Sequence, residues 1–385
     1  MIYLDNAAST QIHEEVLDVM LPFLKEQYGN PSSIHRFGRL TEKAINKARK
    51  EVSSLINAGP DEILITSGGT ESNNTALYGI ANLKKGNHII TSSIEHEAIL
   101  EPCKKLEKQG FDVTYLAVNN KGEIDPAELE DKITDKTCLV TIMFANNEVG
   151  TTQPISEIAK ICKNHNIPFH SDAVQAVGKI PIDVKNLGID LLSISSHKIN
   201  GPKGIGALFI RSGLIIDPLI LGGGQEHGLR SGTENVSGIV GFGKACALAQ
   251  QNLDANISHM QNLRDYMVSK IPAEISHTTY NGHETHRTPN NAHFTFLGVN
   301  GEDLIIKLDE HGIAASTGSA CSVKTQKASH VLQSMGFSHE QITGSLRLTV
   351  GIFNTKEEID SAVEILKKVV SELRSVSPFK EKYGF

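Results

Sequence analysis

The chain has 385 residues, of which 39% are hydrophobic and 21% charged, as expected for a soluble protein with two domains. Its formal net charge of −7 argues against direct binding to nucleic acid, which requires a basic face. We find no secretion signal and no apolar stretch long enough to cross a bilayer, so no membrane contact is expected. Five cysteines without CxxC spacing predict a reduced, cytoplasmic protein without disulfides or zinc.

Short apolar runs alternate with helical patterns between residues 61 and 211. The runs lie at 62–66, 88–93, 138–145, 167–172, 191–196 and 205–210. Several are continuously apolar, which is typical of strands buried on both faces. A helical pattern such as 154–166 between two runs predicts a mainly parallel sheet with helices on both faces. In such sheets ligands bind beyond the carboxyl ends of the strands.

The last third of the chain has a different order of elements. Residues 236–270 have a mostly helical pattern and are expected to lead into a second domain. Strand-like segments follow at 292–298 and 345–350, and a helix is predicted at the end. The apolar residues of that helix follow a 4-3-4-3 spacing, namely Ile359, Val363, Leu366, Val370 and Leu373.

Two glycine-bearing segments are candidates for anion binding. "SGGTESNN" at 67–74 follows a strand and presents backbone N–H groups to an anion, or is an ordinary helix start capped by Ser67 or Thr70. "GGGQEHGLRSGTEN" at 222–235 is either a surface turn or a source of phosphate ligands, including ligands for a neighbouring subunit.

Polar residues that follow two neighbouring strands favour pyridoxal phosphate. Asp172 follows an apolar strand, where a carboxylate is costly unless it meets a cation or a donor, and Gln175 lies three residues on. Ser195, His197 and Lys198 stand at the end of the next strand. A lysine there can form a Schiff base with an aldehyde, and a carboxylate can keep a pyridine nitrogen protonated. The alternatives are a capping aspartate and a surface lysine.

These motifs together resemble the cysteine desulfurases of the NifS/IscS group, which are class-V aminotransferases among the fold-type I pyridoxal phosphate enzymes. The match covers nearly the whole chain in order, through "YLDNAAST", "YGNPSSIH", "TSGGTESNN", "EHEAIL", "NNEVGTTQP", "HSDAVQAVGK", "SHKINGPKGIG", "GGGQEHGLRSGTEN", "TGSAC" and "SLRLTVG". The resemblance implies an α/β fold with a large domain, 16–255, built on a mainly parallel seven-stranded sheet flanked by helices. Residues 1–15 and 256–385 would form a smaller α+β domain that carries the catalytic cysteine loop.

The resemblance also implies pyridoxal 5'-phosphate as the cofactor and L-cysteine as the substrate. The implied roles are a Schiff base on Lys198, a bond from Asp172 to the pyridinium nitrogen, stacking of His96 on the ring and a hydrogen bond from Gln175 to the phenolic oxygen. The implied phosphate ligands are Gly69, Thr70, Ser195, His197 and, from the second subunit of a homodimer, Thr233. The implied ligands of the substrate carboxylate are Asn147 and Arg347. No metal is expected to take part in turnover, and the motif "HETH" at 283–286 is not expected to bind one.

Cys321, in "ASTGSACSV", would accept the sulfur. Lys198 would remove the substrate Cα proton, the Cys321 thiolate would attack the substrate sulfur, and alanine and a persulfide would result. A free thiol has a pKa near ~8.5, so a local base or cation must help to form the thiolate, and we name His96 for that task. Half of the segment 316–328 can span on the order of 20 Å, enough to carry the sulfur to an iron–sulfur scaffold, whose cluster Cys321 can contact, or to a tRNA-thiolation relay.

Three alternatives stay open: a selenocysteine lyase, another class-V aminotransferase, and a non-catalytic assembly partner, although the presence of Lys198 argues against the last. The sequence also departs from the usual motifs of the group. Ile352 replaces an arginine, Gln225 and His227 alter the glycine-rich segment, and two lysines follow the key cysteine, Lys324 and Lys327. We expect these departures to affect partner recognition and not the residues assigned to chemistry.

Overall fold

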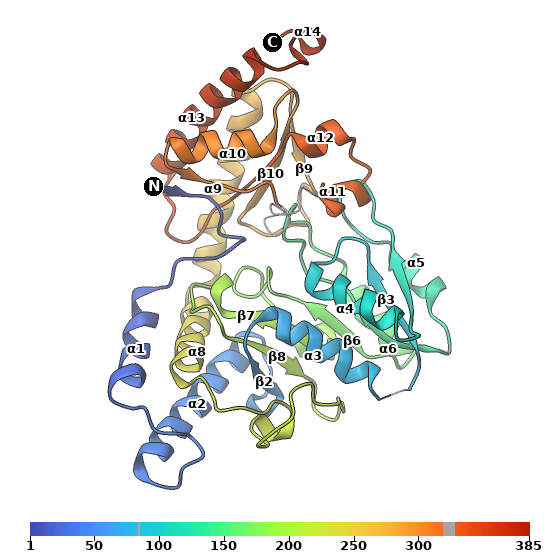
Figure 1. Cartoon of the computed structure of the whole chain (residues 1–385), viewed down its shortest axis with the longest axis vertical. Coiled ribbons are helices and arrows are strands. Elements are labelled where there is room, and N and C mark those ends of the chain that lie inside the picture. The colour runs from blue at the N-terminus through green and yellow to red at the C-terminus, as the bar shows by residue number, and fades with distance from the viewer. Residues whose placement is uncertain (84, 319–327) are drawn as a thin grey trace.

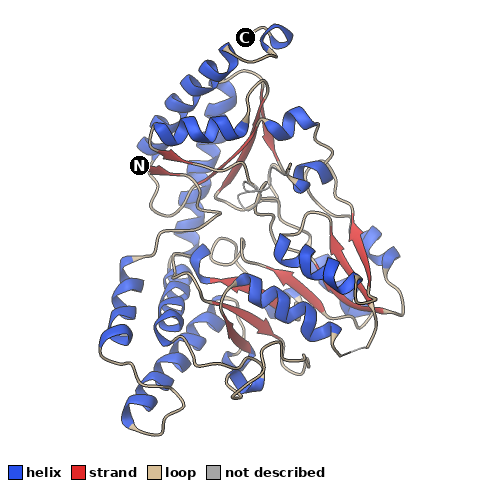
Figure 2. Ribbon diagram, in the orientation of Figure 1, coloured by secondary structure: helices blue, strands red, loops and turns tan. Residues whose placement is uncertain are grey.

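A seven-stranded sheet forms the centre of the larger part of the protein in this computed structural model, which describes residues 1–83, 85–318 and 328–385 (Figures 1 and 2). The strand order is β2 (Ile63–Thr66), β8 (Gly206–Ile210), β7 (Leu191–Ser195), β6 (Phe169–Asp172), β5 (Thr137–Thr141), β3 (His88–Ser92) and β4 (Asp112–Leu116). All neighbouring strands are parallel except β8, which is antiparallel to both of its neighbours. The predicted mainly parallel sheet is therefore confirmed.

Strand β4 is the one strand of this sheet that the apolar runs did not include. It lies at the sheet edge and pairs only with β3 among the described residues. Its first residue, Asp112, is exposed and its middle residues are half-buried, whereas all five residues of β3 are buried. An edge strand needs less apolar surface than a central one, which is why a search for apolar runs missed it.

Helices cover both faces of this sheet, as Figure 2 shows. Successive residues of a strand enter opposite cores: in β2, Ile63 and Ile65 pack on one face and Leu64 on the other. The helices that contribute to the first core include α1 (Glu14–Lys25), α2 (Arg36–Leu55), α6 (Ile155–Asn164) and α8 (Val236–Gln251). The opposite core contains residues of α3 (Gly69–Ala81) and α4 (Glu97–Glu107). Two shorter helices, α5 (Pro126–Lys132) and α7 (Val184–Leu187), contribute to the first core.

A smaller antiparallel sheet has β10 (Asn291–Phe296) between β9 (Thr278–Asn281) and β12 (Ser345–Thr349), beside a parallel pair of β1 (Ile2–Tyr3) and β11 (Ile313–Ala314). The longer helices of this part are α9 (Leu253–Glu274), α10 (Gly301–Glu310) and α13 (Lys356–Ser375), followed in size by α11 (His330–Ser334), α12 (His339–Thr343) and α14 (Lys380–Tyr383). The strand-like segments and the closing helix expected here are confirmed. Leu4 belongs to the core of this part, but the proposed division at residues 15–16 and 255–256 stays a prediction.

None of the helices in the described ranges has the length and apolar character that a membrane span requires.

The N-terminal segment runs from the smaller sheet to the end of the large one. Asn6 Nδ2 donates to the carbonyl oxygen of Thr349 on β12, at 2.8 Å. Four residues later, the Thr10 backbone N–H donates to the carbonyl oxygen of His197, just after β7, at 2.9 Å. The segment therefore places a stretch of backbone between the two sheets.

A buried carboxyl group lies beneath this junction, between β3 and the end of β5. Glu95 is fully buried, and its Oε1 accepts hydrogen bonds from Ser92 Oγ at 2.6 Å and from the Met143 backbone N–H at 2.9 Å. Its Oε2 has no partner among the described residues. Burial raises the pKa of Glu95 to about 8, so the folded protein holds this group in its protonated form at neutral pH.

We predict that Glu95→Gln removes a pH-dependent loss of stability. Because the native carboxyl keeps its proton to about pH 8 and the unfolded one ionises near 4.5, the unfolding free energy of the wild type falls as pH rises through this window. Relative to the Gln variant, the wild type should lose roughly 4 kcal/mol of unfolding free energy between about pH 5 and about pH 8. Urea denaturation measures this loss. Glu97→Gln, a change in an exposed acid two residues on, should follow the wild type. Parallel pH curves for wild type and Glu95→Gln would contradict this prediction.

Candidate active site

A cavity of about 610 Å³ opens at the carboxyl ends of the parallel strands, between the two sheets. Ten of the twelve residues predicted to act in catalysis or binding line this one cavity, namely Gly69, Thr70, His96, Asn147, Asp172, Gln175, Ser195, His197, Lys198 and Arg347. The strands β3, β5, β6 and β7 are neighbours, so the residues that follow them meet at one edge of the sheet. Arg347 comes instead from β12 of the smaller sheet.

Asp172, the last residue of β6, points a well-supported carboxylate into this cavity. Its Oδ2 accepts a hydrogen bond from Asn73 Nδ2 at 2.6 Å, and its Oδ1 accepts one from the Val174 backbone N–H at 3.0 Å. Asn73 lies on α3, is buried and also lines the cavity. The sequence motifs included Asn73 but assigned it no role. Its contact with Asp172, 99 positions away, is decided by packing.

The Lys198 amine contacts the N-terminal segment. Its Nζ donates to the carbonyl oxygens of Ala7, at 2.5 Å, and Ala8, at 2.9 Å. Gln175 Nε2 donates to the same oxygen of Ala7 at 3.0 Å. The motif "YLDNAAST" was noticed in the sequence without a role for it, and backbone carbonyl groups carry no side-chain signal that would have indicated one.

The start of α3 can hold an anion. Its cap residue is Gly68, which has no side chain to accept a hydrogen bond from the first N–H groups of the helix. The absence of a side chain at Gly69 lets Val174 pack closely against the start of the helix, because a Cβ at residue 69 would come within 2.7 Å of Val174 Cγ2. Thr70, Ser195 and His197 add side-chain donors around the same cavity. This donor set fits a phosphate group.

Two histidines of the cavity are neutral because they are buried. Burial, together with the charges of Lys198, Lys203 and Lys179, lowers the pKa of His197 to about 4. Burial also lowers the pKa of His96. His96 caps α4, and its Nδ1 accepts the Ala98 backbone N–H at 3.0 Å. The proton of the neutral ring therefore sits on Nε2, which makes His96 a hydrogen-bond donor and not a free base.

Arg347 is oriented by three oxygen atoms and keeps one donor unused. Its guanidinium donates to Asp5 Oδ1 at 2.8 Å and to the carbonyl oxygens of Asn147 at 2.8 Å and Gly318 at 3.2 Å. Its side chain is 2% exposed, and within the described part of the chain its Nε has no partner. A buried donor on a fixed guanidinium suits a carboxylate ligand. Asp5 was not predicted to contribute.

Glu148 connects the residues on either side of the segment that bears Cys321. Its Oε2 accepts a hydrogen bond from Ser329 Oγ at 2.5 Å, and a Cβ on Gly318 would lie 3.2 Å from the same oxygen. Glu148 is buried, lines the cavity and has a pKa raised by burial. Sequence reasoning missed it, although it follows Asn147 directly. Gly318 and Ser329 also line the cavity.

The two other predicted residues differ in what is known of them. Cys321 lies outside the described residues, as do Lys324 and Lys327. Thr233 is exposed and does not line the cavity of its own chain.

The departures from the usual motifs occupy different environments. Gln225 Oε1 accepts the Gly232 backbone N–H at 2.9 Å and so closes the turn within 222–235, and His227 has a left-handed backbone, with φ 58°. Ile352 lines a second, smaller cavity that Lys198 also lines. Lining the same cavity is not contact, so the expectation that the departures do not affect the residues assigned to chemistry stays a prediction.

The histidines of "HETH" lie close to an acid from a distant segment. Ligand atoms of Glu123, His283 and His286 lie within 4.8 Å of one another. The Nδ1 of His283 accepts the backbone N–H groups of Thr285 and His286, at 3.1 and 2.9 Å, so the neutral ring carries its proton on Nε2, the atom that faces Glu123. A metal ligand at that position would have to give up this proton. The geometry gives no support to a metal site.

Comparisons with known proteins agree with this geometry. The family model for class-V aminotransferases matches residues 2–362. A curated relative from Dictyoglomus turgidum, named cysteine desulfurase IscS, is 50% identical over 384 residues, which cover 99% of this chain and 98% of the relative.

Two solved structures have the same fold. One, described as a NifS-like protein, has a TM-score of 0.91 and 39% identity over 96% of this chain and 99% of its own. The other, SspA in complex with cysteine, has a TM-score of 0.81 and 37% identity over 92% of this chain and 100% of its own. These comparisons confirm the resemblance that the motifs indicated. The chain belongs to the class-V aminotransferase family.

Proposed function

We propose that the chain is a cysteine desulfurase that converts L-cysteine to L-alanine and leaves the sulfur as a persulfide on Cys321. The observation that carries this proposal is the convergence of Lys198, Asp172 and Arg347 on one cavity that Gly318 and Ala328 also line. Cys321 lies between these two residues in the sequence. The names of the curated relative and of the solved structure with cysteine support the same reaction.

The cavity residues fit pyridoxal phosphate. The phosphate would be held at the start of α3 by Gly69 and Thr70, with Ser195 and His197 beside them. Asp172 would meet the ring nitrogen, Gln175 the phenolic oxygen and His96 the ring face. When bound, the cofactor supplies an aldehyde for the Lys198 amine and a ring that takes up an electron pair from the substrate Cα.

The side chains of the protein bind the substrate and transfer its proton and its sulfur. Arg347 and Asn147 bind the substrate carboxylate, and the Lys198 amine takes the Cα proton. The Cys321 thiolate attacks the substrate sulfur, so that a sulfur–sulfur bond forms while the Cβ–sulfur bond breaks and its electron pair stays on Cβ. Cβ then takes up a proton, and Cα regains one from the Lys198 ammonium, which gives alanine. Because Nε2 of His96 carries the proton, His96 stabilises the thiolate as a donor and does not act as the base first named for it.

Removing the Lys198 amine and removing the Cys321 thiol should each stop the reaction. We expect Lys198→Ala to lower the rate of alanine formation from L-cysteine by at least about 10²-fold, because both the cofactor linkage and the proton acceptor are lost. Cys321→Ala should abolish sulfide release in the presence of a small thiol reductant. Both products are measured in one incubation of purified protein with pyridoxal phosphate.

The alternatives give other results in that assay. Unchanged sulfide release by Cys321→Ala would refute the role of Cys321. A lyase specific for selenocysteine would reject cysteine, another class-V aminotransferase would convert a 2-oxo acid whether or not Cys321 is present, and a non-catalytic partner would release no alanine.

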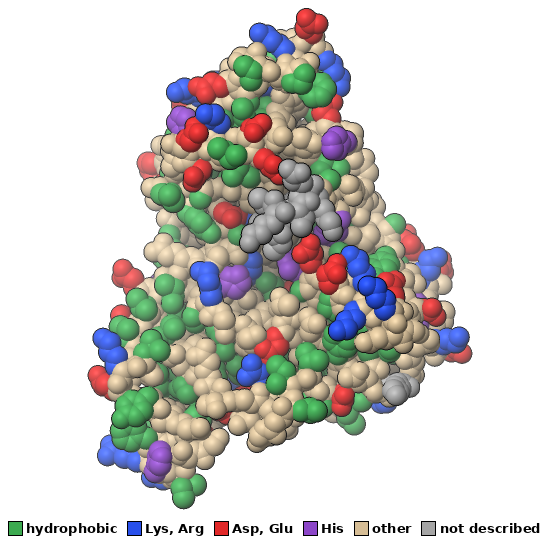
Figure 3. All heavy atoms as spheres, in the orientation of Figure 1, with side chains coloured by type: hydrophobic (Ala, Val, Ile, Leu, Met, Phe, Trp, Pro, Cys, Tyr) green, Lys and Arg blue, Asp and Glu red, His purple; other side chains and the backbone are tan. Residues whose placement is uncertain are grey.

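We further propose that the enzyme is a homodimer in which the partner subunit's Thr233 completes the phosphate site. Large hydrophobic side chains are exposed on and beside α1 and α2, as Figure 3 shows at the lower left, and include Leu17, Leu24, Tyr28, Phe37 and Leu40. Ile215 and Leu221, in the segment after β8, are exposed as well. A groove that Thr70 and Leu219 line opens beside the cavity. The segment 222–235 is tied to α2 by a nearly buried ion pair between Glu226 and Arg49, at 2.6 Å.

Complementation tests this arrangement. Thr233→Val should weaken cofactor affinity about tenfold, because one hydrogen bond to the phosphate is lost. In a mixed dimer with Lys198→Ala chains, one site combines an intact Lys198 with an intact Thr233 from the other chain. We expect that site to bind pyridoxal phosphate with wild-type affinity, measured by absorbance titration. A monomer in sedimentation, or no recovery in the mixture, would contradict the proposal.

The acceptor of the sulfur is, in this proposal, an iron–sulfur scaffold or another sulfur-acceptor protein of the cytoplasm. The four described cysteines are free and buried, namely Cys103, Cys138, Cys162 and Cys246, which suits a reducing compartment.

Shortening the segment 316–328 should impair the delivery of sulfur to a scaffold protein but not the conversion of cysteine to alanine. We expect removal of three residues after Cys321 to leave alanine formation with a small thiol reductant near the wild-type rate. Transfer of labelled sulfur to a scaffold protein should fall at least about tenfold, because the persulfide has to reach outside the cavity. An insertion of the same length is the control. Equal losses of both activities would contradict the idea.

A further inference from the structure

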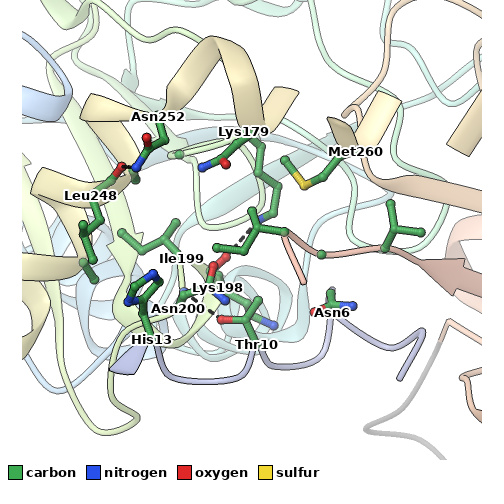
Figure 4. A pocket seen from close by; sticks show the side chains of 17 residues that line it. Asn6, Thr10, His13, Lys179, Lys198, Ile199, Asn200, Leu248, Asn252 and Met260 are labelled. Atoms are coloured by element: carbon green, nitrogen blue, oxygen red, sulfur yellow. Dashed lines mark hydrogen bonds between the residues drawn. The ribbon is translucent and has the colours of Figure 1, made fainter. Parts of the chain in front are cut away.

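The N-terminal segment, residues 4–10, holds the Lys198 amine without using a side chain. The Lys198 Nζ donates to the carbonyl oxygens of Ala7 and Ala8, at 2.5 and 2.9 Å. The smaller cavity that Lys198 lines, of about 160 Å³, is also lined by Asn6 and Thr10 of this segment (Figure 4). Atoms that face a cavity lack packing partners on that side, so hydrogen bonds contribute more to fixing the segment there. The position of the two carbonyl groups therefore depends on the anchors of the segment.

Thr349, the last residue of β12, anchors this segment to the smaller sheet. Its hydroxyl oxygen accepts the Ala7 backbone N–H at 2.9 Å. Its carbonyl oxygen accepts a hydrogen bond from Asn6 Nδ2 at 2.8 Å, and its backbone N–H donates to the carbonyl oxygen of Leu4 at 2.7 Å. Both Thr349 and Ala7 are buried. Without the hydroxyl, the buried Ala7 N–H would lose its acceptor, and the segment would shift to find another.

Ala7 connects this anchor to the reactive amine. The residue presents its N–H to Thr349 and its carbonyl oxygen to Lys198. Gln175 Nε2 donates to the same carbonyl oxygen at 3.0 Å. The oxygen that receives the Lys198 amine thus belongs to the residue whose N–H the Thr349 hydroxyl accepts.

The other end of the segment is anchored beside Lys198. Thr10 Oγ1 donates to the carbonyl oxygen of His197 at 2.9 Å and accepts the Asn200 backbone N–H at 2.8 Å. These bonds attach the segment to residues on either side of Lys198 in the sequence. Thr349 and Thr10 together therefore set the distance between the Ala7 carbonyl group and the main chain that carries the amine.

The two carbonyl oxygens matter for proton transfer. In the proposed function, the Lys198 amine takes the substrate Cα proton and becomes an ammonium group. Hydrogen bonds from a charged donor are stronger than those from a neutral one, and acceptors of such bonds stabilise the charged form. Carbonyl groups held in place before the reaction therefore favour removal of the Cα proton.

We propose that Thr349 is a positioning residue for Lys198: its hydroxyl fixes Ala7, whose carbonyl oxygen, with that of Ala8, receives the Lys198 ammonium. This inference rests on the proposed function, in which Lys198 takes the Cα proton. The motif "SLRLTVG" contains Thr349, but only Arg347 was assigned a role from it.

The reactivity of Lys198 in the full chain without added cofactor tests this proposal. Acetylation of Lys198 is followed by peptide mass spectrometry, with the exposed Lys203 as the internal reference. An ammonium group cannot attack the reagent, so weaker contacts with the two carbonyl groups should leave more free amine. We expect Thr349→Val, which keeps the shape and removes the hydroxyl, to speed acetylation of Lys198 about fivefold. Thr349→Ser, which keeps the hydroxyl, should restore the wild-type rate.

A threonine on the neighbouring strand β10 provides a matched control. Thr295 is as buried as Thr349, and its Oγ1 accepts Asn281 Nδ2 at 2.9 Å and donates to the carbonyl oxygen of Gln341 at 3.2 Å. Neither partner belongs to the N-terminal segment. Thr295→Val should therefore lower the unfolding free energy, measured with urea, and leave the acetylation of Lys198 unchanged.

Proton transfer in the protein loaded with pyridoxal phosphate gives a second readout. Lys198 should exchange the Cα hydrogen of L-alanine for solvent deuterium, a reaction that needs no thiol, and NMR follows it. We expect Thr349→Val to slow this exchange about fivefold, and Thr349→Ser and Thr295→Val to leave it near the wild-type rate.

A second variant covers the case in which Thr349→Val does not fold. Asn6→Ala removes the bond to the Thr349 carbonyl oxygen and only enlarges the cavity that Asn6 lines, so it should speed acetylation of Lys198 in the same direction. An unchanged acetylation rate in folded Thr349→Val, or in Asn6→Ala if Thr349→Val does not fold, would overturn the inference. So would an equal increase in Thr295→Val or in Thr349→Ser.

The acetylation result separates this inference from the proposed function, because it needs neither cofactor nor cysteine. A chain in which Thr349→Val changes both readouts as expected but which forms no alanine from cysteine would refute the desulfurase and leave the role of Thr349 standing.

Discussion

The bond between the Lys198 amine and the carbonyl oxygens of Ala7 and Ala8 connects the two parts of the molecule at the active site. The same short segment is anchored to the smaller sheet by Asn6 and to the large sheet through Thr10. Since the strand that carries Arg347 belongs to the smaller sheet, this segment fixes the position of Arg347 relative to the Lys198 amine. A shift of one part against the other would change the distance between Arg347 and Lys198.

Burial, more than pairing, sets the protonation states around this junction. His170, in the centre of β6, has a pKa of about 3 because it is fully buried, and its ring nitrogens meet Thr141 and Ser193. His197 is neutral for the same reason, and Glu95 keeps its proton. Because these groups are neutral, only a few charged groups set the electrostatic potential in the cavity. In a low-dielectric setting each of those charges has a large effect on its neighbours.

Much of the candidate site could be predicted because parallel strands end at one edge. His96, Asp172, Ser195 and Lys198 follow neighbouring strands, and their meeting is a consequence of strand order. Asn73, Asp5 and Glu148 could not be found in this way. Asp5 contacts Arg347 across 342 positions, and no local pattern contains that information. The carbonyl groups of the N-terminal segment are invisible in a sequence, since every residue carries one.

The sequence by itself determined the parallel sheet, the positions of polar residues after its strands, and the family to which the motifs belong. Burial on both faces and turn formation depend on the types of residues in each local segment, so they can be recognised in the sequence. Tertiary structure alone decided which polar groups touch and which hold protons. It placed Thr233 on the outside of its own chain and showed His96 as a donor. The reason is physical: hydrogen-bond partners and desolvation depend on distances between segments far apart in the chain, and those distances exist only once the two sheets have packed.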